Sequence, residues 1–177
     1  MIERFRAMAA ECGFSYTGML DVGTIKVRQE VRDACAADKC KAYNKTWSCP
    51  PACGTLDEGL AKIRKYKMGI LLQTTGNLED SLDYESMEQT GIQHGKNLDK
   101  FAKEIKKLYP ACKVIGAGAC TRCSPCTYPD SPCRFPDDMT SSMEALGMVV
   151  SDVCKDNNLP YYYGAGTLTY TSCILLG

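Results

Sequence analysis

Four cysteines between residues 120 and 133 are spaced C-x2-C-x2-C-x6-C, and this spacing constrains the fold more than any other feature of the chain. Cysteines that only fill a core act as small apolar side chains and need no fixed interval. Thiolates that surround one metal centre do need one. The segment CTRCSPCTYPDSPC therefore predicts a metal-binding loop, with the ligands Cys120, Cys123, Cys126 and Cys133.

This spacing favours an iron–sulfur cluster over zinc. Three cysteines at two-residue intervals let one winding loop supply three corners of a cubane cluster, with backbone N–H groups turned towards its sulfides. The bacterial ferredoxin run C-x2-C-x2-C-x3-C-P is related, and the longer last interval here lets Cys133 close the same cluster. Structural zinc sites usually use two separated C-x2-C pairs, so zinc is the less favoured alternative. A thioredoxin-like pair of Cys123 and Cys126 would leave both flanking thiols unexplained.

A second group of cysteines lies in the segment CAADKCKAYNKTWSCPPAC, with the looser spacing C-x4-C-x8-C-x3-C. Its members are Cys35, Cys40, Cys49 and Cys53. Pro50 and Pro51 remove two N–H groups and stiffen the chain beside Cys49. The only tryptophan, Trp47, is placed either to shield a centre from solvent, which tunes a cluster's potential, or simply to fill the core.

The twelve cysteines among 177 residues also bear on the cellular compartment of the protein. The N-terminal segment MIERFRAMAAECGF has no apolar signal region and no cleavage site, so we expect no secretory signal. The chain is long and apolar enough to bury a core. Its clustered cysteines therefore indicate metal ligands in the reducing cytoplasm rather than a disulfide scaffold. We interpret the other four as small buried hydrophobes, with Cys112 as the first exception to consider; they are Cys12, Cys112, Cys154 and Cys173.

The charge balance narrows the choice of partners. Lysine plus arginine equals aspartate plus glutamate, 21 of each, which gives no reason to expect nucleic acid or an anionic membrane surface. The apolar runs are far too short for a membrane span. A redox protein or redox enzyme is the expected partner, and the sequence leaves the oligomeric state open.

Hydrophobic periodicity predicts a single α/β domain over residues 1–177, with a mixed sheet flanked by helices and two cysteine-rich cluster-binding loops. In the first half we expect a helix over 2–12 that Gly13 stops, and then a strand over 14–20. A second helix should run through Val27, Val31 and Ala34. A Thr55–Glu58 capping box should open a third helix, and a buried strand should follow over 67–75. In the second half we expect an amphipathic helix over 92–109, with one face formed by Leu98, Phe101, Ile105 and Leu108. A strand should follow over 112–120, and a Ser141–Glu144 capping box should open another helix. Two strands within 160–176 should be joined by a turn at Gly164 and Gly166.

Other candidate chemistry in the sequence is weak. His94 is the only histidine and has no obvious partner, so we expect a solvated or capping role. No Ser-His-Asp, H-E-x-x-H or P-loop pattern is present. Gly116 and Gly118 form only half of a dinucleotide-binding loop, and their place before Cys120 predicts a close backbone approach to a cluster instead. The sequence therefore predicts no catalytic residue.

The motifs VRDAC, KCKAY, WSCPP, GACTRCSPC, CRFP and SSMEALGMVV resemble the DUF2284 family of predicted metal-binding proteins. This resemblance spans most of the chain and implies iron–sulfur binding. It supports Cys35, Cys40 and Cys49 in the first group and all four cysteines of the second. It gives less support to Cys53, so either Cys53 is a fourth ligand particular to this chain or the first site is completed from elsewhere.

Three functions follow as hypotheses. The first is one-electron transfer through two [4Fe-4S] clusters, one in each cysteine group. The second is a reductase in which an open-site cluster, or two coupled clusters, act on a small substrate. The third is a zinc-binding interaction module whose metal contributes folding energy. The spacing does not decide whether two clusters would be separate, share atoms or exchange a ligand between the groups.

Overall fold

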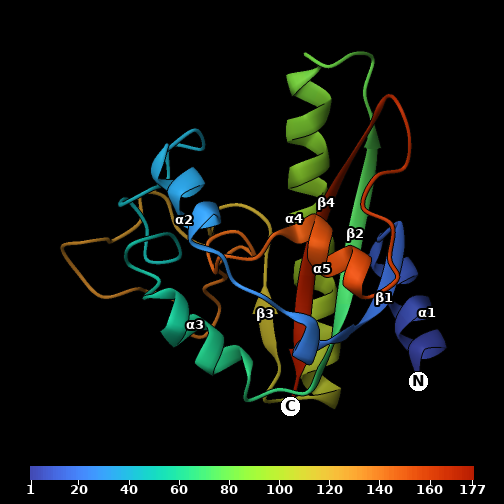
Figure 1. Ribbon diagram of the computed structural model, residues 1–177, viewed down its shortest axis with the longest axis horizontal. Coiled ribbons are helices and arrows are strands. Elements are labelled where there is room, and N and C mark those ends of the chain that lie inside the picture. Colours follow the sequence, from blue (N-terminus) through green and yellow to red (C-terminus); the bar gives the residue numbers. More distant parts are fainter.

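Four strands form one antiparallel sheet in the order β1-β2-β4-β3 in the computed structural model, which describes residues 1–177 (Figure 1). The strands are β1 Tyr16–Asp21, β2 Met68–Asn77, β3 Lys113–Ile115 and β4 Thr167–Leu176. The long central strands β2 and β4 pair along their whole length, with Ile70 opposite Ile174. Because all three strand pairs are antiparallel, the expected mixed sheet is wrong. A helix between two strands sets the length of their connection but not the direction of the second strand.

Helices cover both faces of this sheet. They are α1 Ile2–Cys12, α2 Gln29–Ala36, α3 Leu56–Ile63, α4 Tyr84–Leu108 and α5 Val150–Asp156, and a short 3-10 turn spans Val22–Thr24. Helices α1 and α4 pack on one face, while α3, α5 and the chain around Met143 pack on the other. No helix has both the length and the apolar character that crossing a membrane requires.

The central strands are apolar on both faces, which explains why they read as continuous hydrophobic runs. Ile70 and Leu72 of β2 join the core beneath α1 and α4, whereas Leu71 between them joins the core beneath α3 and α5. Successive side chains of a strand point to opposite faces, so a strand covered on both sides needs no polar alternation. Burying each such side chain contributes about 1.5–3 kcal/mol. The expected single α/β domain is confirmed.

Several expected elements are confirmed with their stop signals. Helix α1 ends at Gly13, whose φ of 99° is left-handed and suits glycine. The Thr55–Glu58 capping box opens α3: the Thr55 N–H donates to Glu58 Oε2 at 2.9 Å, and the Glu58 N–H donates to Thr55 Oγ1 at 3.2 Å. Strands β1 and β2 lie where they were expected. Helix α2 carries Val31 but begins after Val27, which bridges to Met148 instead.

Helix α4 begins earlier than its hydrophobic pattern predicts. It starts at Tyr84, where Asp83 caps it by accepting the Ser86 N–H at 3.1 Å. Its first turns carry no apolar stripe, and Tyr84 is 69% exposed, so periodicity could not find them. At the other end Leu108 is 40% exposed and therefore lies at the margin of the buried face.

The second predicted capping box is wrong. Turns span residues 143–147, Ser142 and Met148 form isolated bridges, and the helix begins only at Val150. Gly147 has a φ of 83°, and two hydrogen bonds, Gly147 N–H to Glu144 O and Met148 N–H to Met143 O, close a single turn there as a Schellman motif. A left-handed glycine at this point cannot lie inside a continuous helix.

The expected C-terminal hairpin is also wrong, because only β4 forms. The three tyrosines before it lie in a loop, where the Tyr163 hydroxyl donates to Gln73 Oε1 at 2.6 Å and its ring stacks on Tyr16 at 4.0 Å. Gly166 instead accepts the Leu78 N–H at 2.8 Å, which fixes the start of β4 beside the end of β2. Strand β3 is shorter than expected, three residues within 112–120.

His94 is buried on α4, and the expected solvated or capping role is wrong. Its Nδ1 lies 2.9 Å from Thr74 Oγ1 and its Nε2 lies 2.6 Å from Ser172 Oγ, so hydroxyls from β2 and β4 satisfy both ring nitrogens. Phe14 packs edge-on against the ring at 5.5 Å. Desolvation by this burial lowers the pKa of His94 to about 4, from 6.5. The ring is therefore neutral at pH 7 in the folded protein.

We expect His94 to make the free energy of unfolding depend on pH. Its pKa is lower in the folded protein than in the unfolded chain, so the unfolded chain binds more protons between pH 6.5 and pH 4. The contribution of neutral His94 to the free energy of unfolding is thus complete above pH 6.5. It is lost as the pH falls towards 4, and the total loss is about 3 kcal/mol. Urea unfolding of the protein and of His94→Gln at both pH values measures this. Subtracting the free energy of unfolding of His94→Gln removes the contribution of the other titrating groups. Equal pH dependence of this free energy in the two proteins would contradict the prediction.

Candidate metal centre

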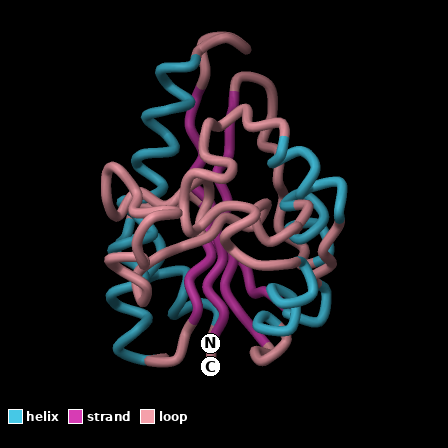
Figure 2. The backbone as a smooth tube through the Cα atoms, turned by 90° about the vertical axis from the view of Figure 1, so that its left-hand side faces the viewer, coloured by secondary structure: helices cyan, strands magenta, loops and turns pink.

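The two cysteine groups lie on loops at the same side of the molecule. The first group begins at Cys35 in α2 and ends at Cys53 just before α3, and the second follows the short edge strand β3. Figure 1 shows both loop regions beyond the β3 edge of the sheet, and Figure 2 shows these loops facing the viewer in front of the strands. Segments about 80 residues apart in the sequence therefore meet here, as the contacts between Trp47 and Ser131 show.

Side chains of the first loop bond directly to the second loop. The Trp47 indole Nε1–H donates to Ser131 O at 3.1 Å, and the Trp47 ring packs edge-on against Tyr128 at 4.9 Å. The Tyr128 hydroxyl donates to Asn44 Oδ1 at 2.7 Å. Trp47 is half-buried and lies outside both hydrophobic cores, so filling the core is not its role. It joins the two cysteine loops.

Ser48 makes a second connection between the loops, and sequence reasoning missed it. Its side chain is almost wholly buried, and its Oγ accepts the backbone N–H of Cys120 at 3.1 Å. The same Oγ lies 3.8 Å from Cys49 Sγ. Ser48 thus links one cysteine of each group. No sequence signal distinguishes this serine from any other, since only the fold brings Cys120 to it.

Cys35 lies within electrostatic range of two other cysteines of the first group. Desolvation raises the pKa of the Cys35 thiol, and the neighbouring Cys40, Glu144 and Cys49 raise it further, which places Cys40 and Cys49 within electrostatic range. Cys49 is buried, Cys35 is half-buried and Cys40 is exposed. Their role as ligands of one metal centre stays a prediction.

Cys53 is set differently from the rest of its group. Desolvation raises the pKa of its thiol, and the positive charge of Arg32 partly offsets this. Its Sγ donates to the backbone oxygen of Ala145 at 3.6 Å. It also lines a large cavity. Cys53 therefore differs from Cys35, Cys40 and Cys49 in its contact with Ala145, although Cys49 lies within electrostatic range of it as well.

Arg32 supplies an unused hydrogen-bond donor beside the first group. Its Nη2 donates to Gly54 O at 2.9 Å, but its buried Nε has no hydrogen-bond partner. The guanidinium charge acts on both Cys35 and Cys53. A buried N–H without an acceptor costs about 1–3 kcal/mol, so an anionic group at this position would stabilise the site. A thiolate-ligated cluster is such a group.

In the second group the backbone favours the thiolate of Cys126. Desolvation alone would raise the pKa of this thiol, but hydrogen bonds from the backbone of Tyr128, Trp47 and Thr127, together with the Cys123 side chain, lower it overall. Thiolates are the form that binds metal. N–H···S bonds of this kind also tune a cluster's potential. The bond from Trp47 again comes from the other loop.

An ion pair fixes the second loop to α4. The Arg122 guanidinium contacts both carboxylate oxygens of Asp99, with Nη1 donating to Oδ2 at 2.9 Å, and its Nε–H donates to Asp138 O at 3.1 Å. Lys106 of α4 pairs with Asp138 at 3.2 Å. These contacts tie the triple cysteine run, in which Arg122 stands, to the longest helix of the fold.

Three of the four cysteines outside the two groups lie in the hydrophobic cores. Cys12, Cys154 and Cys173 are buried in the two hydrophobic cores, so the interpretation of these three as small buried hydrophobes is confirmed. Cys112, the expected first exception, is only half-buried against one of the cores. Burial raises the pKa of Cys154 to about 11 and that of Cys173 to about 12. All twelve thiols are free. No three His, Cys, Asp or Glu side chains are grouped as ligands of a single metal ion.

The site and fold together define a cysteine-rich α/β protein with two adjoining thiol-bearing loops. The family model described as "Predicted metal-binding protein (DUF2284)" matches residues 18–176, and the chain belongs to this family. Among solved structures it is similar to epoxyqueuosine reductase from Streptococcus thermophilus, with 14% identity and a TM-score of 0.43 over 98% of this chain and 45% of that one. The chain thus spans less than half the length of that reductase. No curated protein matches it.

Proposed function

We propose that the chain holds two [4Fe-4S] clusters, one in each cysteine group, and passes single electrons to a redox partner. Membership of a predicted metal-binding family supports the metal, and the spacing C-x2-C-x2-C-x6-C supports iron and sulfide over zinc. The single observation that carries the proposal is the direct contact between the two cysteine loops. Two groups of four thiols lie on adjoining loops, joined by Trp47 and Ser48.

The residues around the thiols suit this role. Backbone hydrogen bonds to Cys126 stabilise its thiolate, and the unpartnered Arg32 Nε offers a donor beside the first group. A bound cluster supplies reversible one-electron chemistry, with a potential set by hydrogen bonds to sulfur and by solvent exclusion. Trp47 and Tyr128 would exclude water where the loops meet. The one histidine, His94, is already engaged by Thr74 and Ser172, and electron transfer needs no acid–base residue.

Anaerobic purification of the full chain tests the proposal. Two [4Fe-4S] clusters give about eight iron and about eight acid-labile sulfide per chain, and a brown colour that bleaches with dithionite. Colourless protein that contains stoichiometric zinc and no sulfide would contradict the proposal and favour the interaction-module hypothesis instead.

A reductase is the second candidate function, and the position of Cys53 favours it. Cys53 has less support from the family pattern than the other seven cysteines, and it lines a cavity of about 880 Å³. If an iron of the first cluster lacks a protein thiolate, a small substrate in this cavity would have access to it. Cys133 of the second group lines the same cavity.

Substitution of Cys53 separates these two functions. If Cys53 is the fourth ligand, as electron transfer through two closed clusters requires, Cys53→Ala lowers the iron content by about half. If iron and sulfide stay at the level of the unaltered protein, Cys53 is not a ligand and the reductase is favoured. An EPR spectrum that changes when a small ligand such as cyanide is added would then identify the open iron.

A further inference from the structure

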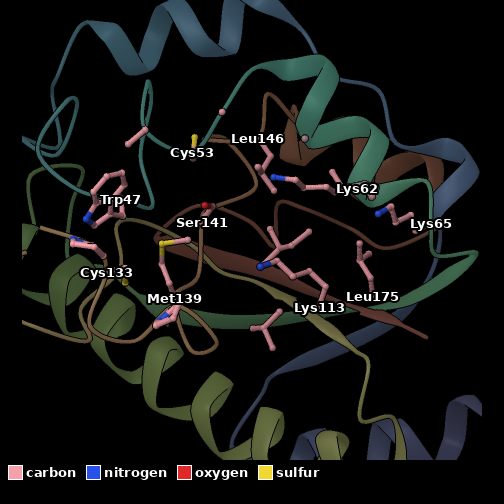
Figure 3. Close-up of a pocket in the computed structure, with 18 of the residues that line it drawn as sticks. Trp47, Cys53, Lys62, Lys65, Lys113, Cys133, Met139, Ser141, Leu146 and Leu175 are labelled. Carbon is pink, nitrogen blue, oxygen red and sulfur yellow. The ribbon is translucent and has the colours of Figure 1, made fainter. Parts of the chain in front are cut away.

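The cavity of about 880 Å³ has two chemically different ends. One end is formed by the cysteine loops, with Trp47, Cys53 and Cys133, and the other by α3 and β3 (Figure 3). Only two of the eight candidate cluster ligands line it. Residues other than these cysteines therefore form most of the cavity wall, and a cluster in either loop would border the cavity at one end.

Three lysines gather at the end away from the cysteines. Lys62 and Lys65 come from α3 and its C-terminal turn, and Lys113 comes from β3. Figure 3 shows the amino groups of Lys62 and Lys113 reaching towards the middle of the cavity from opposite walls. Asp130, on the cysteine-bearing loop, is the only acidic residue of the lining. This end of the cavity is thus positively charged.

None of these lysines forms a salt bridge within the protein, although Lys62 acts electrostatically on Glu58 one helical turn earlier. None of the three takes part in any of the ion pairs, which use other lysines, namely Lys26, Lys45, Lys106 and Lys107. Although Lys113 stays accessible from the cavity, desolvation lowers the pKa of its ammonium group, and the charges of Lys62 and Lys106 lower it further. Two ammonium groups that repel each other across a cavity are both stabilised when an anion lies between them.

The walls between the two ends are apolar and rigid. Ile63, Ile115, Leu146 and Leu175 line the cavity and also belong to the hydrophobic core beneath α3 and α5. Such residues are held in place by packing, so the pocket is formed before any ligand arrives. Its volume lies within the range of about 300–1,000 Å³ that is usual for small-molecule sites.

We propose that this cavity binds a small amphipathic organic anion, with its anionic group between Lys62 and Lys113 and its apolar body along Ile115 and Leu175 towards Cys53 and Cys133. The site goes beyond electron transfer between proteins, because it gives the chain a ligand of its own. It also does not depend on the nature of the metal, since the residues that bind the anion lie outside both cysteine groups.

A pair of probes that differ only in charge tests the proposal. Naphthalene-2-carboxylate and naphthalene-2-carboxamide share one apolar body, and only the first is an anion. We expect isothermal titration calorimetry on the anaerobically purified full chain to show about tenfold tighter binding of the carboxylate. Raising the salt concentration should weaken carboxylate binding and leave carboxamide binding unchanged, because salt screens accessible charges.

Single lysine substitutions locate the binding site. Lys62→Met and Lys113→Met keep the length of the side chain and remove its charge, so each should weaken carboxylate binding about three- to tenfold and change carboxamide binding by less than about twofold. Lys96→Met on the exposed side of α4 is the matched control, since Lys96 forms no ion pair and does not line the cavity. It should bind both probes as the unaltered chain does.

Three outcomes would overturn the proposal. The first is equal affinity for the two probes, the second is carboxylate binding that Lys62→Met and Lys113→Met leave unchanged, and the third is no carboxylate binding at millimolar concentration. Iron and sulfide are measured separately, so the two proposals can fail independently. If the chain binds the carboxylate but holds zinc, this inference stands and the iron–sulfur proposal is wrong.

Discussion

Replacing Cys126 with alanine is expected to remove about half of the iron and half of the acid-labile sulfide from the anaerobically purified protein. Cys126 is the third thiol of the triple run, and backbone hydrogen bonds lower its pKa, which favours the thiolate form. A cubane cluster that loses this ligand would keep three thiolates on a loop that no longer closes around it. The first cysteine group has its own four thiols and should keep its cluster.

The matched control for this substitution is Cys112→Ala. Cys112 lies one short strand before the second cysteine loop and is half-buried like Cys126, but it packs against the core of the α1–α4 face. It should keep full iron and sulfide. Loss of iron from the control, or full iron in Cys126→Ala, would contradict the assignment of ligands. If the metal is zinc, the same two variants report on zinc instead, because thiolate ligation is common to both metals.

The contact between the loops adds a consequence to the Cys126 substitution. Trp47 bonds to Ser131 and packs on Tyr128, and its backbone bonds to Cys126, so the first loop rests on the second. A loosened second loop should therefore make the first cluster more sensitive to air. The rate of bleaching on exposure to oxygen, followed for the cluster that remains, measures this effect.

The two cysteine groups could be recognised in the sequence because their spacing is local, and their role as ligands stays a prediction. The intervals C-x2-C-x2-C and C-x4-C are imposed by one loop each, and no tertiary contact is needed to recognise them. The meeting of the two loops could not be found in this way. It depends on Ser48 and Trp47 reaching residues more than 70 positions later, and serine and tryptophan at those positions also fit a core or a surface.

The lysines of the cavity escaped sequence reasoning for a related reason. Lys62 lies on a helix and Lys113 on a strand, and each reads locally as an ordinary solvated charge. Their convergence arises only because α3 packs on the sheet face next to β3. His94 shows the reverse case: a histidine on a polar helix segment reads as solvated, but hydroxyls from two strands meet it in the interior.

The elements themselves were predictable where local and tertiary signals agree. The Thr55–Glu58 box opens α3 because the chain before it turns and the residues after it have an apolar face. The same motif at Ser141 and Glu144 fails because Gly147 takes a left-handed conformation and Met148 pairs with Val27. A capping box specifies how a helix could start, and tertiary contacts decide whether it does.

Replacing Phe101 with alanine is expected to lower the free energy of unfolding by about 3–5 kcal/mol, the largest stability effect of a single side chain in this fold. Phe101 lies at the middle of the buried face of α4, is fully buried and packs edge-on against Phe14 at 6.0 Å. Its loss removes apolar burial and leaves a cavity between α1, α4 and the sheet. A domain at the low end of the ordinary stability of about 5–15 kcal/mol would then be close to unfolding at 37 °C.

Leu108→Ala on the same helix is the control for this prediction. The hydrophobic pattern places Leu108 on one face with Phe101, but the side chain is 40% exposed, so its truncation should cost less than about 1 kcal/mol. Urea unfolding of both variants under the same metal-loading conditions measures the two effects. Similar losses of stability would mean that Leu108 is as buried as the pattern implies and that α4 extends the core to its last turn. A small loss for Phe101→Ala would contradict the packing of α4 on the sheet, and with it the anchor that Arg122 and Asp99 provide for the second cysteine loop.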